Sequence, residues 1–281
     1  MTKMKRLLLL GCGDIPQRLL RRLDLQRWQV TAMRRSELQL PGITTLRGDV
    51  NQPASVATAL ECMPQQVLVT LSPDSRGEDS YRTAYLRPLQ TLVTQLQSSQ
   101  LNPRITLVSS TSVYPQNQGQ WVDEHSPAGG SSDTSRVLHE AEQCLLQSQY
   151  DATVVRFSGI YGPGRDRLIN RVRAGEFSSA NRWTNRIHSE DCAGALKFLL
   201  EQVEQLDNKQ LVLASDCSPV SSCEVESWLA RELGVMHPGK LPDPVVGKRC
   251  RNDHLVQMGY HFLHPDFRSG YRAMLDGQRG L

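Results

Sequence analysis

The chain has 281 residues, of which 39% are hydrophobic, and a formal net charge of +3 at pH 7. Its length allows a sizeable buried core, and its basic residues are spread out, which excludes the dense lysine/arginine block typical of nucleic-acid or membrane-surface binding. The seven cysteines are odd in number and form no C-x-x-C pair, so we expect no metal site and small buried thiols in a reducing compartment.

The first predicted element is the apolar run at 7–10, which ends at Gly11. The basic residues before it and Cys12 after it superficially resemble a lipoprotein signal. Such a signal needs roughly 7–15 apolar residues, however, and this run has about four. A buried first strand explains the run better. No later stretch approaches the ~18 apolar residues of a membrane span, so we expect a cytoplasmic protein without a membrane partner.

Strands and helices then alternate as far as residue 156. The predicted strands are 7–10, 28–33, 43–46, 66–71, 104–109 and 152–156, and the predicted helices are 15–25, 54–60, 81–96 and 133–146. Alternation at this spacing is typical of an α/β fold with a doubly wound parallel sheet and right-handed crossovers.

Beyond Phe157 the alternation loosens. The elements predicted in this part are a helix at 190–203, a strand at 210–214 and a helix at 221–233. Ser221 is the expected cap of the last helix, and Glu224 would complete a capping box. The tail from His237 has proline and glycine at short intervals and no strong period.

The motif GCGDIP at 11–16 lies where the first strand turns into the first helix. A dinucleotide needs one glycine for the tight turn and a second so that the backbone can approach the pyrophosphate, which then binds the free amides of the helix start. Gly11 and Gly13 meet these needs, and Pro16 replaces the third glycine of the usual motif. We therefore predict a nicotinamide dinucleotide site here, with Asp14 and Ile15 in it. The alternative is a glycine turn that binds no nucleotide.

The second strand ends without the acidic residue that holds the ribose 2′-hydroxyl of NAD. Arg34 and Arg35 follow it instead, and two guanidinium groups can pair with a 2′-phosphate. This pattern favours NADP, with NAD as the second choice. The alternative is that both arginines are simply solvated.

These observations predict two parts. Residues 1–158 would form the dinucleotide-binding core, and residues 159–281 a smaller C-terminal lobe over the carboxyl edge of the sheet, facing a substrate. The helix at 190–203 and the strand at 210–214 would return to the core.

Several stretches resemble the extended short-chain dehydrogenase/reductase family, also called the NAD-dependent epimerase/dehydratase family. They are GCGDIP at 11–16, GDV at 48–50, VSSTSVY at 108–114, RFSGIYGPGR at 156–165 and RIHSEDCAGAL at 186–196. The resemblance spans essentially the whole chain and implies a Rossmann fold. It also implies cofactor contacts from Asp49 and Val50 at the adenine, from Leu71 and Ser72 near the pyrophosphate and nicotinamide ribose, and from Ser109.

The family's chemistry depends on a serine or threonine and on a Tyr-x-x-x-Lys dyad, in which the lysine lowers the pKa of the tyrosine. Thr111 matches the first. With Glu142 aligned to the family's glutamate, Thr134 stands where the tyrosine belongs and Leu138 where the lysine belongs. The resemblance is therefore to an atypical member without the dyad. Any catalysed reaction would need another proton donor, and we assign Tyr161 to that role beside Thr111.

His139 and His188 are weaker candidates for the same role. His139 is typical of a solvated helix face, and His188 with Asp191 is typical of a pair that fixes a loop and caps the helix that follows. Tyr161 itself can equally be a structural residue of the lobe. Arg156, Arg165 and Arg167 could hold an anionic substrate such as a nucleotide-sugar phosphate if they lie in a cleft.

Two functions stay open. The first is an NADP-dependent oxidoreductase or epimerase that acts on a small carbonyl or sugar-like substrate with non-standard acid/base residues. The second is a catalytically silent module that senses NADP(H) and regulates a partner. In either case the resemblance suggests a homodimer through the helices at 81–96 and 133–146.

Overall fold

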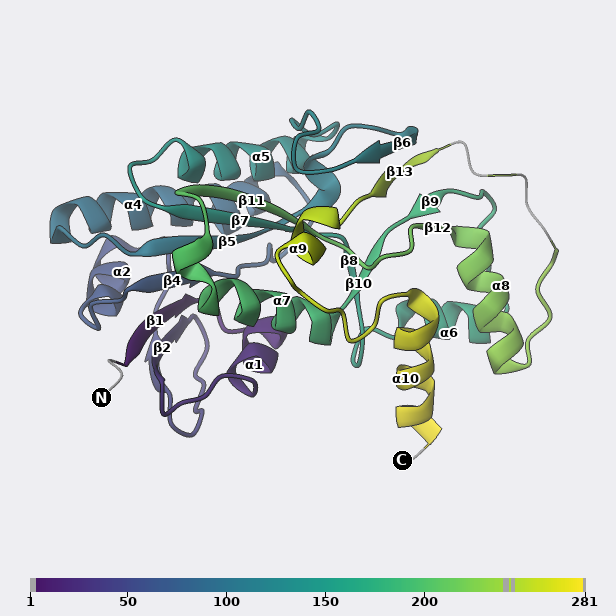
Figure 1. The fold of residues 1–281 in the computed structure, drawn as a ribbon, viewed down its shortest axis with the longest axis horizontal. Helices are drawn as coiled ribbons and strands as arrows, with labels where there is room; N and C mark the ends of the chain where they lie inside the picture. The colour runs from purple at the N-terminus through teal and green to yellow at the C-terminus, as the bar shows by residue number, and fades with distance from the viewer. Residues whose placement is uncertain (1–3, 240–242, 244–245, 280–281) are drawn as a thin grey trace. The chain divides into compact units, whose positions relative to one another are not determined.

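The computed structural model describes residues 4–239, 243 and 246–279. Its strands β1 (Lys5–Leu10), β2 (Trp28–Arg34), β3 (Thr44–Arg47), β4 (Gln66–Val69), β5 (Arg104–Ser110), β7 (Ala152–Phe157) and β11 (Lys209–Ala214) form one sheet. The order across this sheet is β11-β7-β5-β4-β1-β2-β3 (Figure 1). The pairs from β3 to β5 run parallel. The doubly wound α/β sheet predicted from the alternation is confirmed.

The helices that connect these strands cover both faces of the sheet. They are α1 (Asp14–Leu20), α2 (Pro53–Leu60), α3 (Glu78–Tyr81), the π-helical η1 (Arg82–Leu86), α4 (Arg87–Ser99), the 3₁₀ turn η2 (Thr111–Val113), α5 (Asp133–Leu146), α7 (Ser189–Glu201) and the 3₁₀ turn η3 (Val203–Gln205). Leu8 and Leu10 of β1 pack in one core with α2, α4 and α5, whereas Leu7 and Leu9, also buried, point to the opposite face. Burial on both faces explains the continuous apolar run.

The described chain divides into two compact units. The first contains residues 4–113, Ala128–Arg156 and Leu196–Val212, and therefore most of the sheet. The second contains Tyr114–Pro127, Phe157–Ala195 and residues 213–279.

The second unit is built from short strands and helices, of which α6, α8 and α10 pack together. Its elements are β6 (Gln118–Val122), β8 (Gly159–Tyr161), α6 (Arg167–Arg173), β9 (Trp183–Thr184), β10 (Arg186–His188), β12 (Val220–Ser221), α8 (Ser222–Leu233), β13 (Gly247–Cys250), α9 (Asp253–Gln257) and α10 (Phe267–Arg279). The strands pair as β10–β8, β12–β9 and β13–β6. Side chains from α6, α8 and α10 form one apolar core, which includes Trp228 and Phe267.

Ser221 caps α8 as predicted. The side chain of Ser221 accepts a hydrogen bond from the Glu224 amide at 3.1 Å. The Glu224 carboxylate accepts from Arg268 Nη2 at 2.6 Å. The glutamate therefore joins α8 to α10.

Two of the predicted helices differ from the structure by more than two residues at one or both ends. The helix predicted at 15–25 ends at Leu20, where the Arg22 amide donates to the Leu19 carbonyl three residues back, a tighter turn than that of an α-helix. The helix predicted at 81–96 extends over residues 78–99 and widens into the π turn η1 just before Pro88. Proline has no N–H to continue the α-helical ladder, and the wider turn precedes that break.

Helix α10 was not predicted, although Phe267, Tyr271, Met274 and Leu275 have helical spacing and are buried. Gly270 in the first turn of this helix weakens the pattern. A Cβ at this glycine would lie 1.9 Å from the Tyr161 hydroxyl, so the close approach of the two segments requires glycine there. Among the described residues, no helix is long and apolar enough to cross a membrane.

Candidate functional site

A cleft of about 590 Å³ opens in the first unit where the chain leaves β1, β2, β3 and β4. The sheet order places β1 between β2 and β4, and helical connections leave β1 and β4 for different sides, which makes this the topological switch point of the sheet. The cleft is lined by Gly11, Cys12, Gly13, Met33, Arg34, Arg35, Ser36, Gly48, Asp49, Val50, Asn51, Thr70, Leu71, Ser72, Pro73, Asp74, Asp79, Ser80, Thr83 and Ala84. Parallel α/β sheets bind their ligands at such a position.

The two glycines of the first turn have different physical reasons. Gly11 has φ +89°, and a Cβ there would lie 2.2 Å from the Thr70 carbonyl oxygen, so the turn passes too close to β4 for any side chain. The Thr70 hydroxyl also donates to the Gly11 carbonyl at 2.9 Å. Gly13 caps α1 with φ −83°, and a Cβ there would meet nothing within 4 Å. Position 13 therefore faces open space, which leaves room for a ligand to approach the backbone.

The two arginines at the end of β2, Arg34 in its last position and Arg35 directly after it, both line the cleft but are held differently. Arg34 Nη1 donates to the Cys12 carbonyl at 3.4 Å. Arg35 makes a bidentate pair with Asp74, with Nη1–Oδ2 at 2.6 Å and Nη2–Oδ1 at 2.5 Å. The hydrogen bond from Arg35 holds the pKa of Asp74 below its usual value, and the pKa of Arg35 is raised by the same contact. The partner carboxylate of Arg35 was not predicted.

The turn after β3 is fixed by its own carboxylate. Asp49 Oδ1 accepts from the Asn51 amide at 2.9 Å and from Asn51 Nδ2 at 3.1 Å. Gly48 packs against Met33, whose sulfur would lie 2.8 Å from a Cβ at this position. Asp49 and Val50 thus line the cleft from a rigid turn.

The structure gathers most of the predicted cofactor residues in this one cleft, and three lie outside its lining. Asp14 is the first residue of α1 and pairs with Arg18 at 2.7 Å. Ile15 is buried in the core. Ser109, also buried, donates from its hydroxyl to Glu142 Oε1 at 2.5 Å.

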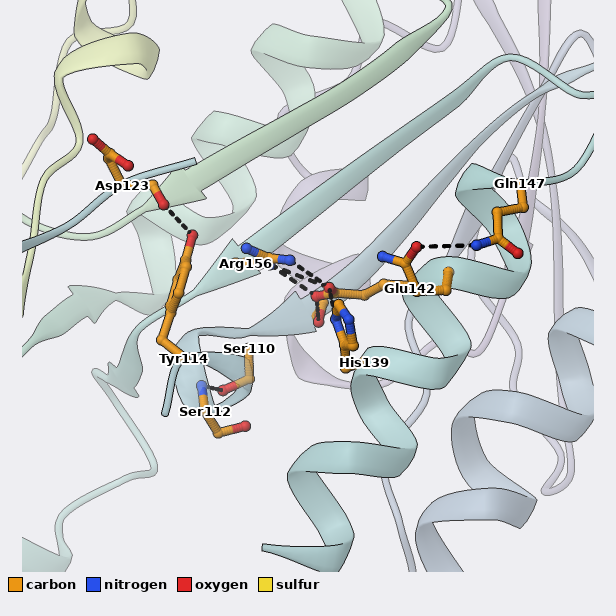
Figure 2. A network of polar contacts seen from close by, with 10 residues as sticks. Ser110, Ser112, Tyr114, Asp123, His139, Glu142, Gln147 and Arg156 are labelled. Carbon is orange, nitrogen blue, oxygen red and sulfur yellow. Dashed lines mark hydrogen bonds and ion pairs between the residues drawn. The ribbon is translucent and has the colours of Figure 1, made fainter. Parts of the chain in front are cut away.

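Glu142 is the centre of a buried polar cluster that the sequence did not predict (Figure 2). Arg156 donates from Nε to Glu142 Oε1 at 3.0 Å and from Nη2 to Oε2 at 2.6 Å, and His139 Nδ1 lies 3.4 Å from Oε2. Burial alone would raise the pKa of Glu142, but the contacts with His139, Arg156 and Ser109 hold it below its ordinary value. The hypothesis that Arg156 binds an anionic substrate is wrong, because its side chain is committed to this carboxylate in the core. The one feature of the sequence that pointed to a role for Glu142 was its alignment with the family's glutamate.

The predicted catalytic region of the first unit lies at the end of β5. Thr111 is buried in η2, directly after Ser110, whose hydroxyl oxygen accepts from the Ser112 amide at 3.1 Å (Figure 2). On α5, the Thr134 hydroxyl lies 3.1 Å from that of the helix cap Ser132. Leu138 is buried. The two positions that the alignment of Glu142 assigns to the dyad thus carry a threonine in contact with the helix cap and an apolar core side chain.

Tyr161, the other predicted catalytic residue, is in the second unit. It is buried in the apolar core beside Tyr271, and its hydroxyl donates to the Asp266 carbonyl at 3.4 Å. Burial, and then the neighbouring Asp216, raise the pKa of Tyr161, which makes it a weaker acid.

His188 and Asp191 have the structural roles that the sequence favoured. His188 Nδ1 accepts from the Glu190 amide at 3.2 Å in the first turn of α7. Asp191 accepts from the Leu263 and His264 amides at 2.6 and 2.9 Å and so fixes that loop. In the part of the chain that the structure describes, no group of His, Cys, Asp and Glu side chains could hold a metal ion.

Known proteins resemble this chain in both sequence and fold. The family model described as NAD(P)H-binding matches residues 11–202. A protein from Methylobacillus flagellatus assigned to the NAD-dependent epimerase/dehydratases is 32% identical, with a TM-score of 0.86 over 99% of this chain and 100% of its own. No curated protein matches the chain.

Two more distant structures share the fold. The Bordetella bronchiseptica enzyme WbmG, in complex with NAD and UDP, is 13% identical with a TM-score of 0.80 over 99% of this chain and 95% of its own. The Thermus thermophilus UDP-glucose 4-epimerase, in complex with NAD, is 16% identical with a TM-score of 0.78 over 99% of each chain. The family model and the relative that matches over the full length together show that the chain belongs to the NAD(P)H-binding, extended short-chain dehydrogenase/reductase family, the NAD-dependent epimerase/dehydratases.

Proposed function

We propose that this protein binds NADP(H) more tightly than NAD(H) and acts as an oxidoreductase or epimerase on a carbonyl or sugar-like substrate. The observation that carries the cofactor preference is the pair of guanidinium groups in the lining of the cleft, from Arg34, the last residue of β2, and Arg35, the next residue. An acidic residue at the end of this strand holds the 2′-hydroxyl of NAD, whereas arginines pair with a 2′-phosphate.

The rest of the cleft fits a dinucleotide. The open side of Gly13 leaves room for a pyrophosphate, and the first-turn amides of Asp14 and Ile15 belong to the group that has no partner within a helix. Asp49 and Val50 would line the adenine, and Leu71 and Ser72 the nicotinamide half. Ser109 is proposed as a cofactor contact from the family resemblance alone, since its hydroxyl already donates to Glu142.

When bound, the cofactor supplies hydride transfer, so the chain must position a substrate and provide a path for one proton. Thr111, buried at the end of β5, is the residue that we propose to contact the substrate. Tyr161 is the proposed proton donor, although its burial and its bond to a backbone carbonyl fit a structural role equally well. The sugar-like substrate class is supported by relatives of the same fold that were solved with UDP or with UDP-glucuronic acid.

A second function is favoured by Thr134 and Leu138. By the alignment of Glu142, Thr134 and the buried Leu138 would stand at the positions of the dyad. The leucine cannot stabilise a tyrosinate or hydrogen-bond a ribose, and the threonine is far too weak an acid to replace the tyrosine. This favours a protein that senses NADP(H) and acts on a partner without turnover.

Titration of the purified protein with NADPH and NADH tests the cofactor proposal. We expect NADPH to bind more tightly and Arg34→Met to weaken it selectively, since one charge pair with the phosphate is lost. Tighter binding of NADH by the wild-type protein would contradict the preference, and no saturable binding of either nucleotide would overturn the whole proposal.

Turnover is tested with the NADPH-saturated protein and a panel of aldehydes, ketones and nucleotide sugars. Steady oxidation that Thr111→Ala abolishes, with the affinity for NADPH unchanged, supports catalysis. Tyr161→Phe then distinguishes a proton donor, which would lose turnover, from a structural tyrosine, which would keep it. Inertness toward the whole panel despite tight NADPH binding favours the sensor.

A further inference from the structure

We propose that Asp74 is a specificity-determining residue of the cleft: by pairing with Arg35 it lowers the affinity for a dinucleotide that carries a 2′-phosphate and so brings the affinities for NADP(H) and NAD(H) closer together. The inference rests on the proposed binding of NADP(H) at this site. Asp74 lies in the loop after β4 and is separated from Arg35 by 39 residues.

The position of the pair follows from the sheet order. Arg35 follows β2 and Asp74 follows β4, while β1, which leads into the glycine turn, lies between these strands. Neighbouring strands are roughly 4.8 Å apart, so the two loops are anchored about 10 Å apart. The long arginine side chain closes this gap, and both residues line the cleft beside Gly11 and Gly13. The pair therefore joins the two sides of the predicted dinucleotide site.

Asp74 binds the two terminal nitrogens of Arg35, which are donors that a phosphate would use. Arginine binds a phosphate best through two parallel N–H donors. Both terminal nitrogens of Arg35 already donate to Asp74, at 2.6 and 2.5 Å. A 2′-phosphate must displace this carboxylate or bind with a like charge beside it, and either event weakens its binding.

The pair can nevertheless open. The side chains of Arg35 and Asp74 are 60% and 67% exposed, and exposed ion pairs are weak because water and salt screen them. Asp49 also lines the cleft and interacts electrostatically with Arg35. Asp74 thus reduces the affinity for NADP(H) without abolishing it. A 2′-hydroxyl carries no charge, so the affinity for NAD(H) depends much less on this carboxylate.

The test compares dissociation constants for NADPH and NADH in the full-length wild-type protein and in four variants: Asp74→Asn, Arg35→Met, the double variant, and Asp133→Asn. Asp133 is the matched control, because it pairs with Arg136 at an exposed site outside the cleft lining and its replacement changes the net charge equally. We expect Asp74→Asn to tighten NADPH by about two- to fivefold at low salt and to change NADH by less than about twofold. This gain should largely disappear in the Arg35→Met background and at high salt, and Asp133→Asn should change neither constant.

The outcomes separate this inference from the proposed function. If the wild-type protein binds neither nucleotide, both fall. If it binds NADPH and Arg35→Met weakens that binding, but Asp74→Asn leaves the affinity for NADPH relative to NADH unchanged or reduces it, only the role of Asp74 is overturned. A gain that persists in the Arg35→Met background also overturns it, because the carboxylate would then act without the arginine.

Discussion

Two arginine–carboxylate pairs of the first unit each make a bidentate contact, but in opposite surroundings. Arg35 and Asp74 are mostly exposed at the cleft, whereas the side chains of Arg156 and Glu142 are 3% and 0% exposed in the core (Figure 2). Water can replace either partner of the first pair, but neither partner of the second can be left alone without an unpaired buried charge. The exposed pair can therefore respond to a ligand, and the buried pair can only hold the fold.

The largest expected effect comes from breaking the buried pair. Arg156→Met should lower the free energy of unfolding by about 3–5 kcal/mol, because it leaves the Glu142 carboxylate buried without its main partner. Urea unfolding followed by circular dichroism measures this. Arg35→Met is the matched control and should change stability little. Equal losses of stability in the two variants would contradict the distinction between the buried and the exposed pair.

The glycine turn offers the same contrast without charges. Gly11→Ala should cost roughly 2–4 kcal/mol, because φ is +89° and the new Cβ would meet the Thr70 carbonyl, which is backbone and cannot move freely. Gly13→Ala has open space around it and should leave stability nearly unchanged while it weakens nucleotide binding. Thermal unfolding and NADPH titration of both variants check this pair of effects. A stable Gly11→Ala protein would show that the turn is looser than its geometry indicates.

Asp216 of the second unit extends the comparison to a buried carboxylate whose charge is less well stabilised by its neighbours than that of Glu142. Burial raises its pKa to about 7, and Arg186 only partly offsets this. Since the folded pKa lies above that of an unfolded aspartate, stability should fall as the pH rises from about 4 to about 7 and then level off. Asp216→Asn should thus stabilise the protein by about 4 kcal/mol at pH 7.5 and by nothing below about pH 4.

Urea unfolding of the wild-type protein and Asp216→Asn across this pH range measures the difference. The backbone contact from Ser218 can be kept by the asparagine oxygen, so the variant tests the charge. A gain that does not depend on pH would assign the effect to packing instead.

The smallest expected effect is that of Tyr161→Phe. Its hydroxyl makes one long hydrogen bond to a backbone carbonyl, so its loss should cost about 1 kcal/mol or less. Unfolding measurements at a fixed pH check this value. A much larger loss in the free energy of unfolding would show that the Tyr161 hydroxyl, like the Glu142 carboxylate, is essential for the stability of the fold.

The parts of this molecule that follow local rules could be predicted from the sequence. The run at 7–10, the glycines after it and the alternation as far as β7 depend on neighbours along the chain, and the structure confirms them. Arg34 and Arg35 could be placed at the cleft for the same reason. Asp74 could not, because its contact with Arg35 forms only after β2 and β4 are placed on the two sides of β1.

The same limit applies to the core. The pairing of Glu142 with Arg156 joins a helix to the next strand, and neither residue type predicts burial on its own. Helix α10 has a helical period, but Gly270, which the contact with Tyr161 requires, makes that period look broken. Local sequence patterns thus fail for residues whose identity is set by a contact with a residue distant in the sequence.

The way in which the first unit is assembled affects how the protein can be shortened. β11, the last strand of the sheet, comes from Lys209–Ala214 and lies beside β7, so the chain completes this sheet only after it has made much of the second unit. A polypeptide that stops at residue 158 would retain the glycine turn and the arginines but would expose the full edge of β7, whose residues are all buried in the intact protein. Open apolar edges recruit other strands, so such a fragment should aggregate rather than serve as a minimal nucleotide binder.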